Sequence, residues 1–339
     1  MAPKVLIIRL SSIGDIVLTT PVVRCLKKHR PQLEIHYLTK KSYAPLLEAN
    51  PYIQKLHLLH QSIEECIEAL NQENFDYIID LHHNLRTLRI KRALRVPAVA
   101  FHKLNFEKWL LTALKINRLP KVHIVERNMQ TLHKWQIEYD GRGLDYFTPK
   151  NISLKPQDIP MSHQAGYVGL VIGAALATKQ MPVEKLAQLC QQIAHPIILL
   201  GGPEDRQAGE TISLTDPVKI YNACGKFSLH ESALLVKQAK LIITHDTGLM
   251  HIAAAYQKPI ISIWGNTVPD FGMGPWYTQP APYNAIFEVA NLRCRPCSKI
   301  GHKKCPKGHF KCMMLQPVAQ IAQAANQFLG VTATSANGV

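Results

Sequence analysis

The sequence predicts an α/β protein with two domains, each built on a parallel sheet with helices on both faces. The first observation is that short apolar β-type runs alternate with amphipathic helical stretches, which is typical of doubly wound sheets. The second is that this alternation stops over residues 140–164, where Gly, Pro, Asp and Asn gather, and then restarts. The third is the length of 339 residues, which supports two hydrophobic cores. We expect a cleft between the domains.

The elements follow in order along the chain. In the first domain we expect strands at residues 4–10, 34–38, 55–59, 76–81 and 97–101. We expect helices at 16–29, 42–48 and 62–71, a basic helix after residue 87, and a helical pattern within 105–135. In the second we expect strands at 167–172, 196–200, 218–221, 241–244 and 259–264, and helices at 183–193, 204–213, 229–237 and 249–256. The predicted domains are residues 1–150 and 165–316, and a last helix at 317–330 is expected to pack back toward the first domain.

Composition narrows the class of protein. With 47% hydrophobic and 19% charged residues the chain is globular, and no apolar run approaches the roughly 20 residues of a membrane-spanning helix. The first residues lead directly into a strand, so we expect no signal peptide and a cytoplasmic protein. The net charge of +15 suits an acidic partner, either a nucleic acid, an anionic lipid surface, or a phosphorylated or carboxylated substrate.

The stretch 241–255 predicts a strand, a tight polar turn and a helix start. Asp246 or Thr247 would cap the helix, and Gly248 would let a ligand approach the backbone. Free N–H groups in the first turn, including that of Leu249, favour a phosphate, and His251 lies one turn further on. The alternative is an ordinary capped helix with a buried histidine.

Two further loops of the second domain end at the same edge of the sheet. Gly173 opens a loop of small residues in which Lys179 supplies a charge for phosphate. Gly201 and Gly202 follow the next strand. Each feature alone fits a solvated lysine or an ordinary turn, but the three loops together predict a nucleotide diphosphate site.

The first domain offers a carboxylate and a polar loop. Asp15 lies just past the central strand, where it is either a general base or part of a helix cap with Ser11 and Ser12 as turn formers. His82 and Arg86 follow the strand at 76–81, as binding groups for an anionic acceptor or as a solvated loop.

The C-terminal part carries a cysteine cluster of Cys294, Cys297, Cys305 and Cys312, with His302 and His309 as further possible ligands. The spacing begins like a zinc knuckle but ends differently, so structural zinc, free thiols and, less readily, disulfides stay open. Interleaved lysines make a zinc-dependent nucleic-acid-binding protein the main rival class. Against it, no known nucleic-acid module is present and Phe310 is the single aromatic residue there. The absence of Asp-x-Asp favours chemistry without a catalytic metal.

Residues 5–21 resemble the N-terminal signature of glycosyltransferase family 9, the lipopolysaccharide heptosyltransferases. The resemblance continues at residues 80–87, 179–182 and 201–202, is strongest at 246–251, and in the cysteine segment is similar to heptosyltransferase II-type members. It implies a GT-B fold and an inverting EC 2.4-type transferase that needs no cofactor or divalent metal. The donor would be ADP-heptose, and the acceptor an inner-core sugar of the lipid A-linked oligosaccharide.

The resemblance also implies roles for residues. Asp15 would be the catalytic base. The implied donor-binding residues are Lys179, Asp246, Thr247, Gly248, Leu249, His251, Gly173, Gly201 and Gly202. The implied acceptor-binding residues are Ser11, Ser12, Gly14, His82 and Arg86.

The chain departs from the family pattern in one loop. Ala174 and Ala175 stand where some members have hydroxyl residues before the phosphate-binding lysine. A family 9 transferase using another nucleotide sugar or acceptor is the alternative. The basic charge suits a peripheral protein at the inner face of the cytoplasmic membrane, and we expect Lys91, Arg92 and Arg95 to contact anionic lipid there.

Overall fold

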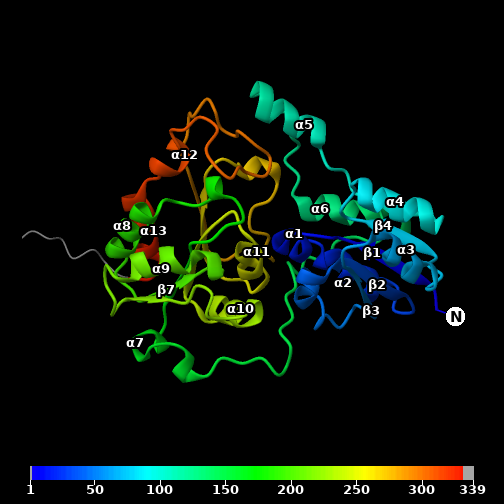
Figure 1. The fold of residues 1–339 in the computed structure, drawn as a ribbon, viewed down its shortest axis with the longest axis horizontal. Helices are drawn as coiled ribbons and strands as arrows, with labels where there is room; N and C mark the ends of the chain where they lie inside the picture. The colour runs from blue at the N-terminus through cyan, green and yellow to red at the C-terminus, as the bar shows by residue number, and fades with distance from the viewer. Residues whose placement is uncertain (1, 331–339) are drawn as a thin grey trace, which may run out of the picture. The chain divides into compact units, whose positions relative to one another are not determined.

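The computed structural model describes residues 2–330 and divides into two compact units (Figure 1). Unit 1 comprises Met1–Asn105, Pro120–Asn151 and Trp276–Pro280. Unit 2 comprises Phe106–Leu119, Ile152–Pro275 and Ala281–Val339. The chain therefore passes from one unit to the other five times. Each unit is an α/β structure on one parallel sheet, as predicted.

Unit 1 contains a five-stranded sheet in the order β3-β2-β1-β4-β5. Its strands are β1 (Lys4–Ile8), β2 (Glu34–Lys40), β3 (Lys55–Leu59), β4 (Tyr77–Asp80) and β5 (Ala98–Ala100). Its helices are α1 (Ile13–Val17), α2 (Thr20–His29), η1 (Lys41–Leu46), α3 (Ile63–Asn71), α4 (Leu85–Leu94), α6 (Ile124–Met129) and η3 (Gln130–Trp135). β1 is central because its apolar side chains are buried between helices on both sides.

The single helix expected at residues 16–29 is two helices. α1 ends at Val17, and Pro21 lies in the first turn of α2. Proline has no N–H to donate and fits the first helical turn, so it begins a new helix at this point. The break leaves α1 as a short helix that carries Asp15 in its first turn.

Residues 140–151 belong to unit 1 and are not a free linker. The buried guanidinium of Arg24 on α2 pairs with Asp140 at 2.8 Å, and it also pairs with Asp145. The carbonyl of Gly143 accepts a third bond from the same guanidinium, at 2.9 Å. A buried charge needs such partners, so this segment is fixed against α2.

Unit 2 contains a six-stranded sheet in the order β11-β10-β9-β6-β7-β8. Its strands are β6 (Val168–Val171), β7 (Ile197–Leu200), β8 (Ile220–Asn222), β9 (Leu241–His245), β10 (Ile260–Trp264) and β11 (Asn284–Glu288). Its helices are η2 (Leu110–Leu114), η4 (Pro156–Asp158), α7 (Met161–Gln164), η5 (Ala177–Lys179), α8 (Val183–Gln192), η6 (Pro203–Asp205), α9 (Arg206–Ser213), α10 (Leu229–Gln238), α11 (Gly248–Ala255), η7 (Pro269–Phe271), α12 (Lys311–Met314) and α13 (Val318–Phe328), and α5 (Asn105–Trp109) begins at its border.

The C-terminal helix differs from the expectation. α13 packs against α8, and Ile321 and Ala325 lie in the hydrophobic core of unit 2. The Asn326 side chain accepts a bond from the Ala194 N–H at 3.0 Å. The expectation that this helix packs toward the N-terminal domain is wrong, because its apolar face completes the core beside β7. Within residues 2–330, no helix has the length and apolar composition needed to cross a bilayer.

Candidate active site

The predicted catalytic carboxylate lies at the carboxyl end of the central strand of unit 1. Asp15 Oδ1 pairs with the guanidinium of Arg9 at 2.6 Å. Its Oδ2 accepts a bond from the Ser12 hydroxyl at 2.8 Å. Ser12 and Asp15 also form the capping box of α1, so the cap is real. These bonds hold the carboxylate in one orientation. Its side chain is still 26% exposed.

Arg9, which the sequence analysis did not select, holds this carboxylate in place. Its Nε donates to the carbonyl of Ser11 at 2.7 Å and its Nη1 to the carbonyl of Leu81 at 2.5 Å. These bonds join the loop after β1 to the end of β4. The sequence signal that could have identified Arg9 is its position directly after a buried apolar strand. Burying an unpaired cation there costs free energy, so a nearby anionic partner is expected.

The electrostatics of Asp15 keep it ionised. Burial raises its pKa, but the charge of Arg9 and the hydrogen bonds from Ser12 outweigh burial and leave the pKa below its usual value. At neutral pH the group is therefore a carboxylate that can accept a proton.

His82 lies in the same electrostatic neighbourhood. Burial and the positive charges of Arg9 and Lys103 lower its pKa to about 4, so the ring is neutral at pH 7. Its buried Nδ1 has no hydrogen-bond partner among residues 2–330. Arg86 is exposed in the first turn of α4.

One of the three cations expected at a membrane surface is engaged elsewhere. Lys91 Nζ pairs at 2.8 Å with Asp80, whose side chain is fully buried at the end of β4. Its charge balances a buried carboxylate, so Lys91 does not serve as a free surface cation. Arg92 and Arg95 are exposed.

In unit 2 the predicted phosphate-binding lysine pairs with the aspartate of the central turn. Lys179 Nζ lies 2.6 Å from Asp246 Oδ2. The hydroxyl of Thr267, a residue not selected from the sequence, donates to the same oxygen at 2.9 Å. Lys179 and Asp246 are 67 positions apart and meet because they follow the neighbouring strands β6 and β9.

The helix that follows this turn presents an open N-terminus. Thr247 is the N-cap residue of α11, but its side chain makes no capping bond. Its hydroxyl lies instead 3.2 Å from that of Thr244. The first-turn N–H groups, including those of Gly248 and Leu249, are thus not capped by this side chain, and with Lys179 they favour an anion. His251 is buried within the same helix.

His245, also not selected from the sequence, fixes the lysine loop. Its Nε2 accepts a bond from the N–H of Met181 at 3.1 Å. Burial lowers the pKa of His245 to about 4, which keeps the ring neutral and this nitrogen available as an acceptor. The end of β9 therefore holds the loop that carries Lys179.

The glycines of the neighbouring loops lie against the side chain of Asp205. A Cβ on Gly173 would lie 2.0 Å from a carboxylate oxygen of Asp205, and one on Gly201 would lie 2.8 Å from it. The N–H of Gly202 donates to that carboxylate at 2.9 Å. These glycines make room for Asp205, which closes the loop after β7 onto the loop after β6.

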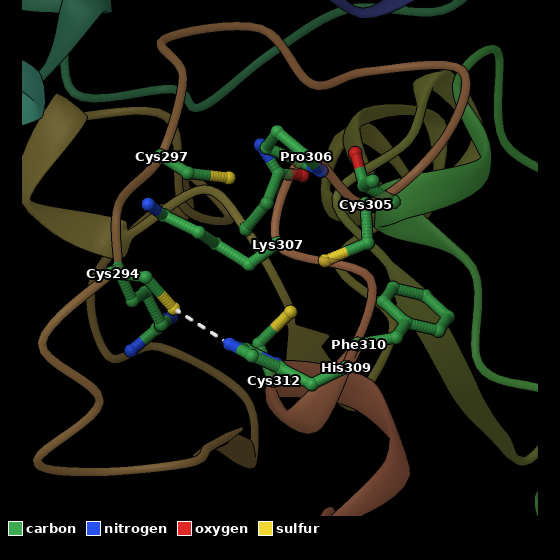
Figure 2. Close-up of a pocket in the computed structure, with 11 residues that line it drawn as sticks. Cys294, Cys297, Cys305, Pro306, Lys307, His309, Phe310 and Cys312 are labelled. Carbon is green, nitrogen blue, oxygen red and sulfur yellow. Dashed lines mark hydrogen bonds between the residues drawn. The ribbon is translucent and has the colours of Figure 1, made fainter.

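The four C-terminal cysteines surround one pocket, shown in Figure 2. All four are free thiols, and Cys294 Sγ lies 3.8 Å from His309 Nε2. Burial and the neighbouring Cys297, Cys305 and Cys294 raise the pKa of Cys312 to about 11. The thiols face a common space, but among the described residues they do not form a group with all ligand atoms within 4.8 Å.

This cysteine segment is joined to the lysine loop. The hydroxyl of Thr178 donates to the carbonyl of His302 at 3.1 Å, and the N–H of His302 lies 2.7 Å from the same hydroxyl. The backbone N–H of Thr178 also donates to that carbonyl at 3.2 Å. Residue 178 directly precedes Lys179, so the cysteine segment supports the lysine loop.

The described residues do contain one group of potential metal ligands within 4.8 Å, formed by His36, His57 and Glu73 of unit 1. The two rings share a hydrogen bond of 2.9 Å. Glu73 already pairs with Lys4 at 3.1 Å and Lys55 at 2.5 Å. Two ammonium groups beside the carboxylate repel a cation, so this is a self-contained polar cluster.

Comparison with known proteins finds one family over most of the chain. The family model described as glycosyltransferase family 9 (heptosyltransferase) matches residues 63–309. A lipopolysaccharide heptosyltransferase 1 of Campylobacter coli is 26% identical over 299 residues, covering 78% of this chain and 84% of the relative.

Solved structures show the same fold. A family 9 glycosyltransferase of Veillonella parvula superposes with a TM-score of 0.77 at 23% identity, over 98% of each chain. The heptosyltransferase WaaC of E. coli, with ADP-2-deoxy-2-fluoro heptose, superposes with a TM-score of 0.64 at 18% identity, over 96% of this chain and 99% of that one. The predicted α/β class and GT-B fold are confirmed. Because the family model covers well over half of the chain, including every strand of the unit 2 sheet and the turns that carry Lys179 and Asp246, the chain belongs to glycosyltransferase family 9 and is a glycosyltransferase.

Proposed function

We propose that this glycosyltransferase moves heptose from ADP-heptose to a sugar of the lipid A-linked inner core, with inversion at the anomeric carbon. The heptosyltransferase relatives support the sugar, and the E. coli neighbour that holds an ADP-heptose analogue supports the nucleotide. The observation that carries the proposal is the Lys179–Asp246 pair at the open N-terminus of α11. It is a charge arrangement suited to a diphosphate leaving group.

Unit 2 would bind the donor. The diphosphate would accept bonds from the first-turn amides of α11 and from Lys179 Nζ. Asp246, fixed by Thr267, keeps the ammonium group directed at this position before the donor arrives. As the bond between the anomeric carbon and the diphosphate oxygen breaks, negative charge grows on that oxygen. These preset donors stabilise the charge without reorganising.

Unit 1 would bind the acceptor and supply the base. The Asp15 carboxylate takes the proton of the acceptor hydroxyl, and the hydroxyl oxygen forms a bond to the anomeric carbon from the face opposite the leaving ADP. Attack from that face inverts the configuration. The neutral His82 ring, with its unpartnered Nδ1, provides a hydrogen-bonding group for the acceptor beside Asp15.

The diphosphate contacts differ from those of relatives with hydroxyl residues before the lysine. Ala174 and Ala175 have no side-chain donor, and the carbonyl of Ala174 accepts a bond from Gln180 Nε2 at 2.9 Å. We propose that backbone amides replace the hydroxyls. Exchange of both alanines for serine would then leave ADP affinity within about twofold, whereas loss of Lys179 would not.

We propose that transfer needs no divalent metal and no cofactor. The thiol set of the cysteine pocket has the chemistry of a structural zinc site, but its sulfur atoms do not reach ligand spacing. The role of the pocket is support of the Thr178–Lys179 loop. Metal analysis of the purified protein, paired with turnover in EDTA, tests both statements. Turnover lost in EDTA and restored by Mg²⁺ or Mn²⁺ would contradict the metal-free step.

The first experiment is calorimetric titration with ADP, UDP and GDP, followed by a transfer assay with ADP-heptose and a lipid A-linked core acceptor. We expect micromolar affinity with preference for ADP, and a product whose anomeric configuration, read by NMR, is opposite to that of the donor. Preference for UDP or GDP would keep the family and replace the donor. Lys237→Ala, an exposed lysine on α10, serves as the matched control for Lys179→Ala.

A further inference from the structure

The segment Phe106–Leu119 of unit 2 exposes large apolar side chains close together in sequence. Phe106 is 65% exposed, Trp109 53%, Leu114 54% and Ile116 45%. The rings of Phe106 and Trp109 stack at 6.2 Å. Single exposed apolar residues are common, but a cluster with two aromatic rings indicates a surface that binds a membrane or another molecule.

This segment is held in place, so the exposure is not that of a loose loop. Leu110 and Leu111 are buried. Lys115 Nζ donates to the carbonyl of Pro296 at 2.6 Å, and Asn117 Nδ2 donates to Asp270 at 2.6 Å. The segment thus rests on the cysteine segment and on η7, and its aromatic rings stay outside.

The neighbouring cysteine segment is basic. Residues 293–311 contain seven Lys or Arg side chains and no Asp or Glu. Lys303, Lys304 and Lys307 are exposed, and Ile300 among them is 62% exposed. Because Lys115 joins the two segments, apolar rings and a dense positive charge belong to one continuous part of unit 2. We call Phe106–Leu119 with residues 293–311 the basic apolar surface.

We propose that the basic apolar surface docks this protein on an anionic lipid bilayer. Aromatic and aliphatic side chains enter the boundary between headgroups and acyl chains, while lysines attract anionic headgroups. Nucleic acid fits less well, because Leu114, Ile116 and Ile300 offer bulk without a stacking face. The inference rests on the proposed function in one respect, since a lipid-linked acceptor places the enzyme at a bilayer.

The location differs from the one expected from the sequence. The cations proposed there lie on α4 and its C-terminus, and Lys91 neutralises Asp80. Arg92 and Arg95 remain exposed, but α4 lacks an aromatic residue to insert. The basic apolar surface combines both ingredients that stable peripheral binding requires.

The test is flotation of the full chain with vesicles of phosphatidylglycerol and phosphatidylcholine, compared with phosphatidylcholine alone. We expect binding to the anionic vesicles that falls with salt. Phe106→Ser/Trp109→Ser should weaken it by about tenfold or more. Lys303→Glu/Lys304→Glu should weaken it similarly and reduce its salt dependence. The matched control is Leu214→Ser/Val218→Ser, which removes two apolar side chains that are 76% and 77% exposed elsewhere in unit 2.

Quenching of Trp109 fluorescence by brominated lipid gives a second readout. Equal vesicle binding by the aromatic variant and its control would overturn the inference, as would binding independent of lipid charge, or capture of oligonucleotides without vesicles. ADP affinity and transfer to a deacylated, water-soluble acceptor should be unchanged in the aromatic variant. Vesicle binding through this surface without ADP-heptose turnover would contradict the proposed function and still support the docking proposal.

Discussion

The Arg9–Asp15 pair of unit 1 and the Lys179–Asp246 pair of unit 2 are built alike but anchored differently. Both follow central strands, and both join a cation to a carboxylate at 2.6 Å. In unit 1 both partners are fixed, because Arg9 also donates to the carbonyls of Ser11 and Leu81 and Asp15 also accepts a bond from the Ser12 hydroxyl. In unit 2 the carboxylate is fixed, because Asp246 also accepts the bond from Thr267.

Under the proposed function, each pair holds one charged group ready for the substrate. Arg9 and Ser12 hold the Asp15 carboxylate in one orientation, and Asp246, itself fixed by Thr267, holds the Lys179 ammonium group. Unit 1 therefore presents a carboxylate, which suits removal of a proton. Unit 2 presents an ammonium group, which suits a leaving diphosphate. Substitutions of the four residues in the two pairs, and of Thr267, can break or sharpen this comparison.

Replacement of Asp15 should have the largest effect. Asp15→Asn keeps the size of the side chain and removes the base, so kcat should fall by about 10³-fold. ADP affinity, measured by calorimetry, should stay within about twofold, because Asp15 does not serve the donor. Glu68→Gln, an exposed change on α3, is the control. A kcat within tenfold of the wild type would remove Asp15 from the base role.

Replacement of Lys179 should come next. Lys179→Ala removes the presented cation, so ADP affinity and kcat should both fall, with a combined loss in kcat/KM of about 10²-fold. Calorimetry and initial rates measure the two parts. If Lys179→Ala left ADP affinity unchanged while Asp246→Ala abolished it, the assignment of roles within unit 2 would be reversed.

Replacement of Arg9 tests the positioning role in unit 1. Burial raises the pKa of Asp15 and Arg9 lowers it, so Arg9→Met should raise the pKa and move the acidic limb of the pH–rate profile to higher pH. The rate at neutral pH should fall by about tenfold because the carboxylate loses its orientation. Arg9→Lys should restore part of both. An unchanged limb would show that Arg9 supports only the fold.

Replacement of Thr267 should have the smallest effect. Thr267→Val removes one hydrogen bond to Asp246, worth about 1 kcal/mol, so ADP affinity should weaken by about fivefold. Thr211→Val on α9, an exposed threonine with a local backbone bond, is the control. Equal affinities of the two variants would mean that Asp246 is held without Thr267.

Local patterns in the sequence predicted most of the fold. Buried strands such as β1 and β9 have apolar β-type runs with clear ends, and the turns after them carry the candidate site residues. β11 was not predicted because it lies at the edge of its sheet, where side chains alternate between exposed and half-buried and give little apolar signal.

Partners across the sheet were the part that the sequence could not provide. Two of these contacts join residues that follow different strands, namely Arg9 with Leu81 and Thr267 with Asp246. The third joins Asp80 at the end of β4 to Lys91 on the helix that follows. The hydrophobic periodicity of a single strand or helix does not show which residues form such pairs. The sequence thus predicted Asp15, Lys179 and Asp246 as candidates, but not the groups that anchor them.

The repeated passage of the chain between the two units bears on protein engineering. Transferases with one sheet for each substrate invite chimeras that exchange donor and acceptor halves. Here, Trp276 lies in the sequence of the second half but belongs to unit 1, where its indole N–H donates to Tyr139 at 2.8 Å and its ring stacks on His123 at 4.6 Å. A chimera joined at a single point near residue 151 would keep a foreign residue in this position. A chimera that exchanges unit 2 should therefore keep the native residues Trp276–Pro280, because they belong to unit 1.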